Sequence, residues 1–561
     1  MSESNAKKLF EKGIKYFSNK EFILAQEYFV KALELSPNRI SILENLATVY
    51  YLNGNYFQAE IILDRMDKLD QSSSKIFDLM VKVLKKLGKI KKLKLYIIKE
   101  LGKKKIDFKY KIFNEFLYPD FFENEKEADL VRVKFEDSIS ELEKINELEL
   151  KVDKDMIDPP IFNISYDYKE NLDINKKIVK LYRKFYPELN QSFINEKKNN
   201  KIRIGFLSEF FTNHTIGKLY RGIIFKLDPK KFDIFIFHSK HTVKSSFYKQ
   251  FLEGEILSNL VNITLPNNFD EKIQSINRKN LDIVFFPDIG MSTEFYYLSF
   301  IRFAKIQITS WGHPVTTGNK SIDYFLSSKL LETQEAQKNY SENLLLSNYL
   351  PMYFYKPVIN KKLNKDELIK KNIYFCSQTL IKIHPHFDNI IKKILDEDKK
   401  AKILFIKDKN EILSKKLFER LKRIIPFKTD QITFLEQLSL ENYINKCGTS
   451  SVLLDPLYFG SGNSFHESMF YGTPTVTLPT ENLKSRIVLG AYKQMQISEP
   501  PIVKNIDEYV DKAVKIANRD NKTMYDNKIL YSQCAGKYLY ENQKFILEFE
   551  EILENLYLKH I

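Results

Sequence analysis

Residues 451–486 read SVLLDPLYFGSGNSFHESMFYGTPTVTLPTENLKSR, and this stretch decides the fold. The apolar run at 452–454 predicts a buried strand. A loop with two glycines follows at 459–464, then a helical pattern, and residues 475–479 predict the next parallel strand. Strand, glycine loop, helix and strand form half of a Rossmann unit, which holds a nucleotide diphosphate at the strand ends. The same shape also fits an ordinary βαβ unit with a flexible turn.

The residues of this loop favour the first interpretation. Glycines such as Gly462 let backbone amides approach a ligand closely. Asn463 or Ser464 is expected to cap the helix, whose dipole favours a phosphate at this end. Glu467 lies about one turn into the helix, where its carboxylate can accept hydrogen bonds from a ribose diol.

The segment resembles the donor-binding motif of the O-GlcNAc transferase and SPINDLY family of glycosyltransferases, particularly the bacterial members that carry tetratricopeptide repeats. The resemblance implies that Gly462, Asn463 and Ser464 hold the donor diphosphate and that Glu467 binds the ribose. Animal enzymes of the family usually have Asp at the place of Glu467, so this chain departs conservatively from the pattern.

A second Rossmann-like half is expected upstream. Residues 202–206 predict a strand, and a strand-to-helix turn follows at 208–217. Further strands are predicted at 233–237, 282–286, 306–310 and 323–326, alternating with helices, which indicates a doubly wound parallel sheet. His214 lies in the turn, and the string SEFFTNHTIGKL resembles the family's active-site loop. His214 is therefore a candidate catalytic residue, as a proton acceptor or a hydrogen-bonding partner of the substrate.

The string WGHPVTTG at 311–318 contains the chain's only tryptophan and resembles the family's Gly-aromatic-Pro-x-Thr-small-Gly motif. A turn of this composition can offer amides and hydroxyls to sugar oxygens, and the alternative is a plain surface turn. In the family this loop lines the sugar and acceptor cavity. The resemblance implies that role for these residues: His313, Pro314, Thr316, Thr317 and Gly318.

The second half is expected to begin with a strand at 373–376, followed by Gln378 and Lys382. The family places a lysine at the position of Lys382 on the donor diphosphate, where a cation stabilises the departing nucleotide; the alternative is a solvent-facing lysine. Gln378 is assigned to the same nucleotide-sugar site. Tyr443 falls where the family puts a ring against the nucleobase, and the alternative is a core aromatic. Helices are predicted near the end, the last at 535–556 packing back across the first sheet.

The amino-terminal part shows a helical repeat. Small, aromatic and proline residues fall at the offsets of a roughly 34-residue tetratricopeptide unit: Gly13, Tyr16, Ala25, Phe29, Ala32 and Pro37. Two further units follow from residues 40 and 74. The repeats are expected to dock a protein acceptor or partner, and the alternative is a helical buttress. Between repeats and sheets, 123–149 predicts a helical hairpin and 151–170 an extended segment.

Composition limits the remaining possibilities. The net charge is +15, but the basic residues are scattered, so no specific nucleic-acid partner is expected. The three cysteines are far apart and indicate a reducing compartment without a zinc site. The polar start resembles no signal peptide, and no apolar run reaches the roughly 18–20 residues of a membrane span. A cytoplasmic protein is expected.

The predicted fold class is α/β, a GT-B arrangement of two Rossmann-like domains behind an all-α tetratricopeptide domain. The expected parts are repeats at 1–105, a helical linker region at 106–200, the catalytic halves at 201–355 and 370–520, and terminal helices at 521–561. The resemblance implies an inverting protein glycosyltransferase without metal or cofactor. Its default reaction moves GlcNAc from the co-substrate UDP-GlcNAc to Ser or Thr hydroxyls. Alternatives are GDP-fucose as donor, UDP-glucose transferred to Asn, a polysaccharide or lipid acceptor, or a non-catalytic scaffold.

Overall fold

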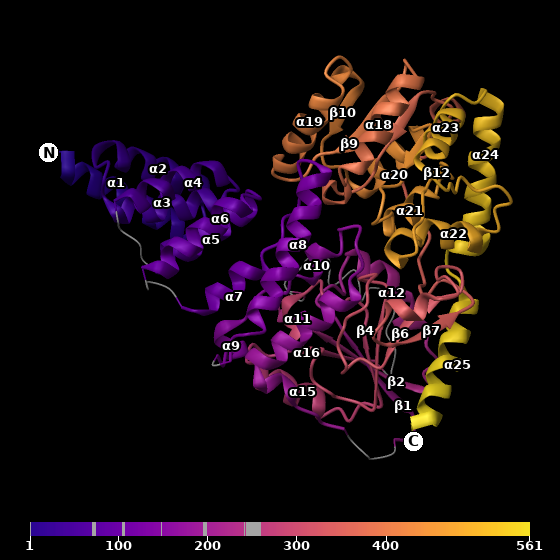
Figure 1. Ribbon diagram of the computed structural model, residues 1–561, viewed down its shortest axis with the longest axis horizontal. Coiled ribbons are helices and arrows are strands. Elements are labelled where there is room, and N and C mark those ends of the chain that lie inside the picture. The colour runs from indigo at the N-terminus through magenta and orange to yellow at the C-terminus, as the bar shows by residue number, and fades with distance from the viewer. Residues whose placement is uncertain are drawn as a thin grey trace. The chain divides into compact units, whose positions relative to one another are not determined.

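The computed structural model describes residues 2–69, 74–103, 107–146, 148–194, 199–240, 242 and 260–560. The chain forms two compact units, 1–121 and 122–561, which are described separately (Figure 1). The boundary predicted between residues 105 and 106 lies outside the described residues.

The first unit is helical, as predicted. Its helices are α1 (Ser2–Ser18), α2 (Phe22–Leu35), α3 (Ile40–Leu52), α4 (Tyr56–Lys68), α5 (Ser74–Lys86), α6 (Ile90–Gly102) and α7 (Lys109–Phe116). Successive helices pack on one another. The close approach of α1 and α2 requires Gly13, because a Cβ there would lie 2.5 Å from the Phe29 ring. Phe29, Ala25 and Ala32 are fully buried in this contact, which explains the repeat pattern.

The second unit opens with α8 (Glu125–Leu142), α9 (Val152–Asp155), α10 (Ile161–Ile164), α11 (Leu172–Phe185) and the 3₁₀ turn η1 (Pro187–Asn190). The predicted hairpin at 123–149 is wrong, because α8 is one continuous helix capped by the side chain of Asn124. The segment 151–170 is not fully extended either, since it contains α9 and α10. Both helices have only four residues, which is too short to show the period of an amphipathic helix, so the sequence did not predict them.

The first sheet is parallel throughout and has the order β3-β2-β1-β4-β5-β6-β7. Its strands are β1 (Ile202–Leu207), β2 (Phe232–His238), β3 (Leu260–Thr264), β4 (Ile283–Phe286), β5 (Ile306–Ser310), β6 (Tyr324–Ser328) and β7 (Asn343–Ser347). Helices α12 (Thr215–Lys226), α15 (Phe269–Asn277) and α16 (Thr293–Leu298) and turn η2 (Ala336–Asn339) connect them. The strands β3 and β7 were not predicted. Both are edge strands with partly exposed residues, so neither has the continuous apolar run of the central strands.

The second sheet is also parallel, in the order β10-β9-β8-β11-β12. Its strands are β8 (Ile373–Phe375), β9 (Lys402–Ile406), β10 (Ile432–Leu435), β11 (Val452–Leu454) and β12 (Thr475–Val476). Its helices are α17 (Lys365–Leu368), α18 (His386–Glu397), α19 (Ile412–Ile424), α20 (Leu440–Thr449), α21 (Asn463–Ser468), α22 (Ile487–Met495) and α23 (Ile506–Ala517), with the 3₁₀ turns η3 (Leu380–Lys382), η4 (Thr429–Gln431) and η5 (Leu483–Ser485). The predicted fold class, two parallel α/β halves behind a helical region, is confirmed.

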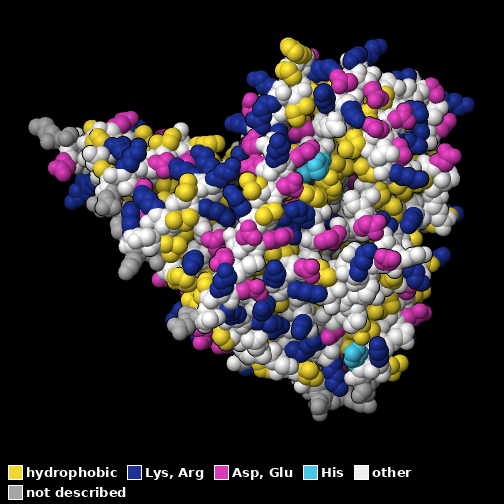
Figure 2. Space-filling model, viewed as in Figure 1, with side chains coloured by type: hydrophobic (Ala, Val, Ile, Leu, Met, Phe, Trp, Pro, Cys, Tyr) yellow, Lys and Arg dark blue, Asp and Glu magenta, His cyan; other side chains and the backbone are white. Residues whose placement is uncertain are grey.

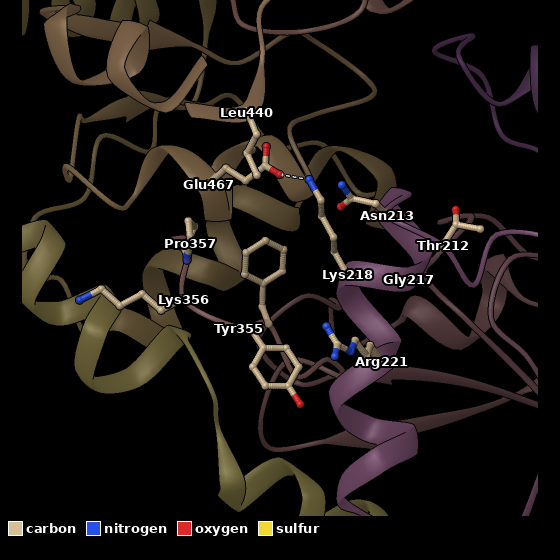
Figure 3. A pocket seen from close by; sticks show the side chains of 11 residues that line it. Thr212, Asn213, Gly217, Lys218, Arg221, Tyr355, Lys356, Pro357, Leu440 and Glu467 are labelled. Atoms are coloured by element: carbon tan, nitrogen blue, oxygen red, sulfur yellow. Dashed lines mark hydrogen bonds and ion pairs between the residues drawn. The ribbon is translucent and has the colours of Figure 1, made fainter. Parts of the chain in front are cut away.

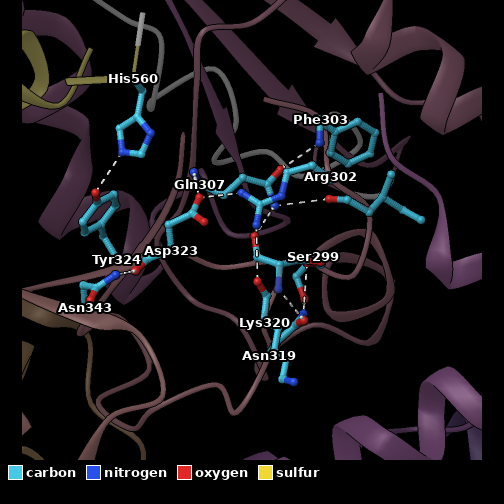
Figure 4. A network of polar contacts seen from close by, with 12 residues as sticks. Ser299, Arg302, Phe303, Gln307, Asn319, Lys320, Asp323, Tyr324, Asn343 and His560 are labelled. Carbon is cyan, nitrogen blue, oxygen red and sulfur yellow. Dashed lines mark hydrogen bonds and ion pairs between the residues drawn. The ribbon is translucent and has the colours of Figure 1, made fainter. Parts of the chain in front are cut away.

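The chain ends with α24 (Asn521–Cys534), the π-helical turn η6 (Ala535–Leu539) and α25 (Gln543–His560). Helix α25 packs against β5 and β7 of the first sheet, as predicted (Figure 1). Phe549 meets Phe285 of β4 with ring centroids 5.8 Å apart. The His560 ring lies 2.9 Å from the Tyr324 hydroxyl, beside the Arg302–Asp323 ion pair (Figure 4). The last helix therefore ties the end of the second half to the first.

The distribution of charge on the surface and the hydropathy of the helices agree with the scattered basic residues and the short apolar runs of the sequence. Lysine and arginine side chains are interspersed with acidic ones on the face shown in Figure 2. No helix of the described residues is long and apolar enough to cross a membrane.

Candidate active site

The candidate site is built from loops that follow parallel strands of both sheets. The loop after β1 carries His214, the loop after β5 carries residues 311–318, and the loops after β8 and β11 carry Lys382 and the glycine residues. Ligands of open α/β sheets bind at the carboxyl ends of the strands. All these loops belong to the second unit.

The glycine loop after β11 is held by Asp455. One carboxylate oxygen accepts hydrogen bonds from the backbone amide and the hydroxyl of Ser461, both at 2.7 Å, and the other accepts from the Thr477 hydroxyl at 2.6 Å. Asp455 is buried, and a Cβ on Gly460 would lie 2.9 Å from its carboxylate. These hydrogen bonds hold the loop against the end of β11 and the start of the segment after β12.

The helix after this loop begins differently from the prediction. Gly462 occupies the N-cap position of α21, and no side chain caps the helix. The prediction that Asn463 or Ser464 is the cap is therefore wrong: both residues lie inside the helix, and their side chains make other contacts. Asn463 donates to Glu467 at 3.2 Å, and the Ser464 hydroxyl accepts a hydrogen bond from Gln378.

Lys382 joins two strand-end loops. Its ammonium donates to Gln378 Oε1 and to the Gly460 carbonyl, each at 2.9 Å, and lies 4.8 Å from the centroid of the Phe459 ring. Because Gln378 also binds Ser464, these groups form one network over the glycine loop. Burial lowers the pKa of Lys382 to about 8, opposed by nearby Asp455, so the ammonium is largely charged at neutral pH. The structure thus brings together Gln378, Lys382, Gly462 and Ser464.

Glu467 faces a cavity of about 220 Å³ (Figure 3). The cavity is lined from both halves by Thr212, Asn213, Gly217, Lys218, Arg221, Phe354, Tyr355, Lys356, Pro357, Leu440 and Glu467. The carboxylate accepts from the Lys218 ammonium at 2.6 Å. Burial raises the pKa of Glu467, and Lys218 opposes that shift. Lys218 was missed by sequence reasoning, because its partner lies 249 residues away.

His214 sits at the N-cap of α12, where its Nδ1 accepts a hydrogen bond from the Ile216 amide at 3.3 Å. The ring stacks on Phe210 with centroids 4.5 Å apart. Burial and the charge of Lys218 lower its pKa to about 4, so the ring is neutral. With Nδ1 accepting, the proton of the neutral ring resides on Nε2. This tautomer favours hydrogen-bond donation to a substrate over proton abstraction.

Tyr443 is buried on α20. Its hydroxyl donates to the Ser464 carbonyl at 3.2 Å and lies 3.0 Å from Ser377 Oγ, and its ring packs near Phe375. In this structure the buried Tyr443 contacts the backbone at Ser464, at the end of the glycine loop, which matches the alternative of a core aromatic. Its contact with a nucleobase stays a prediction.

The 311–318 turn is anchored by Glu342. This carboxylate accepts from the hydroxyl of Thr316 at 2.7 Å and from the amide of Thr317 at 2.8 Å, as well as from the Thr317 hydroxyl. Gly318 has φ +71° and packs so closely on α11 that a Cβ would lie 2.6 Å from the Asn175 backbone. The structure therefore commits both hydroxyls to the turn itself, and their binding of sugar stays a prediction.

In the same turn, His313 is buried in the protein, whereas Pro314 lines a cavity. His313 is buried, its Nδ1 lies 2.8 Å from the Ile289 carbonyl, and its ring stacks on Phe162. Burial lowers the pKa of His313 to about 4. Its Nε2 has no partner among the described residues. Pro314 lines a small separate cavity with Lys484.

The segment between the repeats and the first sheet also contributes, although no chemistry was predicted for it. The buried Lys484 ammonium donates to the carbonyls of Ser165 and Asp167 at 2.9 and 2.5 Å and to Asn171 Oδ1 at 3.1 Å. The Lys484 carbonyl in turn accepts from the Gly460 amide at 2.8 Å. The segment is thereby fastened to the glycine loop. The sequence around Lys484 gave no indication of this role.

No group of three or more His, Cys, Asp or Glu side chains in the described part of the chain is placed to hold a metal ion. Metal independence of the reaction stays a prediction.

Comparison with known proteins gives consistent relatives. Residues 169–356 match Glycosyl transferase family 41. A UDP-glucose:protein N-beta-glucosyltransferase of Actinobacillus pleuropneumoniae is 25% identical over 262 residues, 45% of this chain and 41% of the relative. The probable UDP-N-acetylglucosamine–peptide N-acetylglucosaminyltransferase SEC of Arabidopsis thaliana is 22% identical over 366 residues, 62% of this chain and 36% of the relative. The chain thus covers about two fifths of these relatives.

Among solved structures, a mutant O-GlcNAc transferase of Thermobaculum terrenum superposes with a TM-score of 0.70 at 16% identity, covering 100% of this chain and 98% of that one. At this identity the match supports the fold. The resemblance predicted from the motifs is confirmed by the family match and these relatives.

Proposed function

We propose that this chain, whose residues 169–356 match Glycosyl transferase family 41, is a protein glycosyltransferase that uses a nucleotide-sugar donor. The observation that carries the proposal is the network over the glycine loop, in which Lys382 contacts both Gln378 and the Gly460 carbonyl. It places a cation and a fixed loop together at the carboxyl ends of β8 and β11.

In the proposed reaction the donor diphosphate lies on the glycine loop beside Lys382. As the bond between sugar and diphosphate breaks, negative charge grows on the β-phosphate, and the Lys382 ammonium stabilises it. A fixed cation needs no reorganisation during the step, so its contribution to the transition state is large. The acceptor attacks the sugar from the opposite side and inverts its configuration, and no metal is assigned to the reaction.

Two further residues bind the substrates. Glu467 accepts hydrogen bonds from the ribose diol. This contact is the same in the ground state and in the transition state, so it contributes to donor binding. His214, neutral and protonated on Nε2, donates a hydrogen bond to the sugar or acceptor. This role replaces general-base catalysis by His214 and leaves the residue that receives the acceptor proton unassigned.

The default donor is UDP-GlcNAc, and the default acceptor is a Ser or Thr hydroxyl presented with help from the helical repeats. A second candidate is transfer of glucose from UDP-glucose to Asn, because the similar Actinobacillus protein is named a UDP-glucose:protein N-beta-glucosyltransferase. A GDP-fucose donor is the third candidate.

Thermal melts against nucleotides and nucleotide sugars test the proposal, since a ligand that binds the folded state raises Tm. We expect UDP or GDP, and one sugar derivative of the same base, to raise Tm. Mass spectrometry of incubated protein acceptors then identifies the sugar and the modified side chain. No shift with any nucleotide, in a folded protein, would refute the proposal and support a non-catalytic scaffold.

A further inference from the structure

Lys218 and Glu467 form an ion pair across the two α/β halves. Lys218 lies in the first turn of α12, the helix that follows β1 of the first sheet, and Glu467 lies in α21 of the second half. The Lys218 Nζ is 2.6 Å from Glu467 Oε1, and the two side chains are only 25% and 10% exposed. Figure 3 shows both side chains pointing toward one another at the wall of the cavity.

The two oxygens of Glu467 have different surroundings. Oε1 accepts from Lys218 and also from Asn463 Nδ2 at 3.2 Å. Within the described part of the chain, no hydrogen bond reaches Oε2. One oxygen is therefore committed to the protein while the other is left to a ligand, so a bound ribose need not displace Lys218.

The position of Lys218 is fixed by its neighbour in the chain. A Cβ on Gly217 would lie 1.8 Å from the Thr212 carbonyl oxygen, so α12 packs directly on the loop before it. This close contact sets where the Lys218 side chain leaves the helix. The ammonium is thus presented to Glu467 by a rigid element of the opposite half.

The cavity around the pair carries an excess of positive charge. Among its lining residues are the cations Lys218, Arg221 and Lys356, and Glu467 is the single acidic residue of the set. A cleft with one sign of charge raises the local concentration of ligands of the opposite sign. This lining favours a phosphorylated nucleoside over the uncharged nucleoside.

We propose that Lys218 is a positioning residue of the donor site, which keeps Glu467 ionised and aimed so that its free oxygen accepts the ribose hydroxyls of a nucleoside diphosphate. The inference rests on the proposed function, in which Glu467 binds the ribose. It makes donor binding depend on both halves of the catalytic unit, because each supplies one member of the pair.

The electrostatic reason is the burial of Glu467. A buried carboxylate without a partner takes up a proton at higher pH, because burial penalises its charged form. A protonated carboxyl loses the charge that strengthens its hydrogen bonds. The groups that face Glu467 besides Lys218 are these: Arg221, Lys356, Tyr443, Cys447 and Tyr540. Of these only Arg221 and Lys356 are cations at neutral pH, and neither bonds Glu467.

The test measures binding of UDP and GDP to the full chain by calorimetry between about pH 6 and pH 8. For whichever nucleotide the wild type binds, we expect Lys218→Met to weaken affinity about tenfold or more, as loss of a charge-assisted hydrogen bond predicts. The loss should be larger at the lower pH, because burial raises the pKa of Glu467 and Lys218→Met removes the charge that opposes this shift. Lys218→Arg should restore most of the affinity. Lys226→Met, an exposed lysine at the end of the same helix, is the matched control and should bind as the wild type does.

A double-mutant cycle separates positioning from a folding defect. In a Glu467→Gln background, Lys218→Met should cost much less and lose its pH dependence, because no carboxylate remains to be paired. Thermal melts establish that each variant is folded. Equal affinity of Lys218→Met and wild type at every pH would overturn the inference and leave the proposed function standing. Absence of any nucleotide binding by the wild type would overturn both.

Discussion

The Asp455 carboxylate accepts two hydrogen bonds from Ser461, one from its backbone amide and one from its hydroxyl, each 2.7 Å long. Asp455 directly follows the strand β11, and Ser461 lies in the glycine loop, so the carboxylate holds the loop close to the end of that strand. The Thr477 hydroxyl is a third donor. Burial raises the pKa of Asp455, and these three hydrogen bonds oppose that shift. These bonds hold the loop together with the contacts that Gly460 makes to Lys382 and Lys484.

Replacing Asp455 by Asn should damage both stability and binding. The amide nitrogen cannot accept a hydrogen bond, so at least one of the three donors is left without a partner, at a cost of about 1–3 kcal/mol. We expect a lower Tm and a weaker nucleotide Kd. Asp511→Asn, on the exposed surface of α23, is the control. A variant with unchanged nucleotide affinity would show that the loop keeps its shape without Asp455.

Lys382→Ala should reduce the rate more than it reduces donor binding. Contacts that strengthen as charge develops are worth roughly 3–4 kcal/mol in the transition state, or about 10²–10³ in kcat. Glu467→Ala should instead raise the donor KM with a smaller effect on kcat, because a ribose contact is equal in ground and transition states. Steady-state kinetics on both variants make a paired comparison. If Lys382→Ala changed KM alone, this lysine would not serve the leaving group.

The pH dependence of kcat/KM should report Lys382 in the free enzyme. Its pKa is lowered to about 8, so the stabilising charge is present below pH 8 and is lost as the pH rises through that value. We expect kcat/KM to fall on the alkaline side with a midpoint near 8. In Lys382→Arg the guanidinium stays charged, so whatever activity remains should lack this fall. An alkaline limb shared by both proteins would belong to another group.

The sequence predicted the structure best where the residues of the site and the hydrophobic pattern of a strand or helix lie in the same short segment. The strand, glycine loop and helix around residues 452–468 follow from apolar runs and glycines that are adjacent in the chain. Lys382 contacts Gly460 and Gln378 contacts Ser464, so two motifs that the sequence predicts to form one site are joined in the structure. Such features depend on short segments whose hydrophobic pattern decides their structure.

Long-range pairing could not be predicted in this way. The sequence predicts that the hydroxyls of Thr316 and Thr317 bind a sugar. Nothing in the string 311–318 shows that both hydroxyls donate to Glu342 instead. Likewise, nothing in the sequence around Lys484 indicates that its ammonium is buried against the carbonyls of Ser165 and Asp167. Partners of buried charges are set by tertiary packing, and a single sequence carries no pattern for them.

A second buried lysine provides a stability test. The Lys528 ammonium on α24 donates to the carbonyls of Leu368, Gly448 and Ser450 at 2.8, 2.6 and 2.7 Å, and the side chain is fully buried. Lys528→Met leaves these acceptors without a donor, so we expect a loss on the order of 2–4 kcal/mol in the free energy of unfolding. Denaturant melts measure it against Lys522→Met, which is exposed on the same helix. Equal stability of the two variants would mean that water replaces the ammonium.

Deleting residues 1–121 should separate donor binding from protein modification. These residues form a compact unit of their own, whereas every residue assigned to the donor site lies in 122–561. Without the helical unit we therefore expect the nucleotide-induced rise in Tm to persist while modification of a protein acceptor falls sharply, since the repeats are predicted to present that acceptor. The control is a free nucleotide-sugar hydrolysis assay, which needs no protein acceptor and should be nearly unchanged. If nucleotide binding, hydrolysis and modification were lost together, the helices would act as a buttress for the catalytic unit, and acceptor recognition would have to lie within residues 122–561.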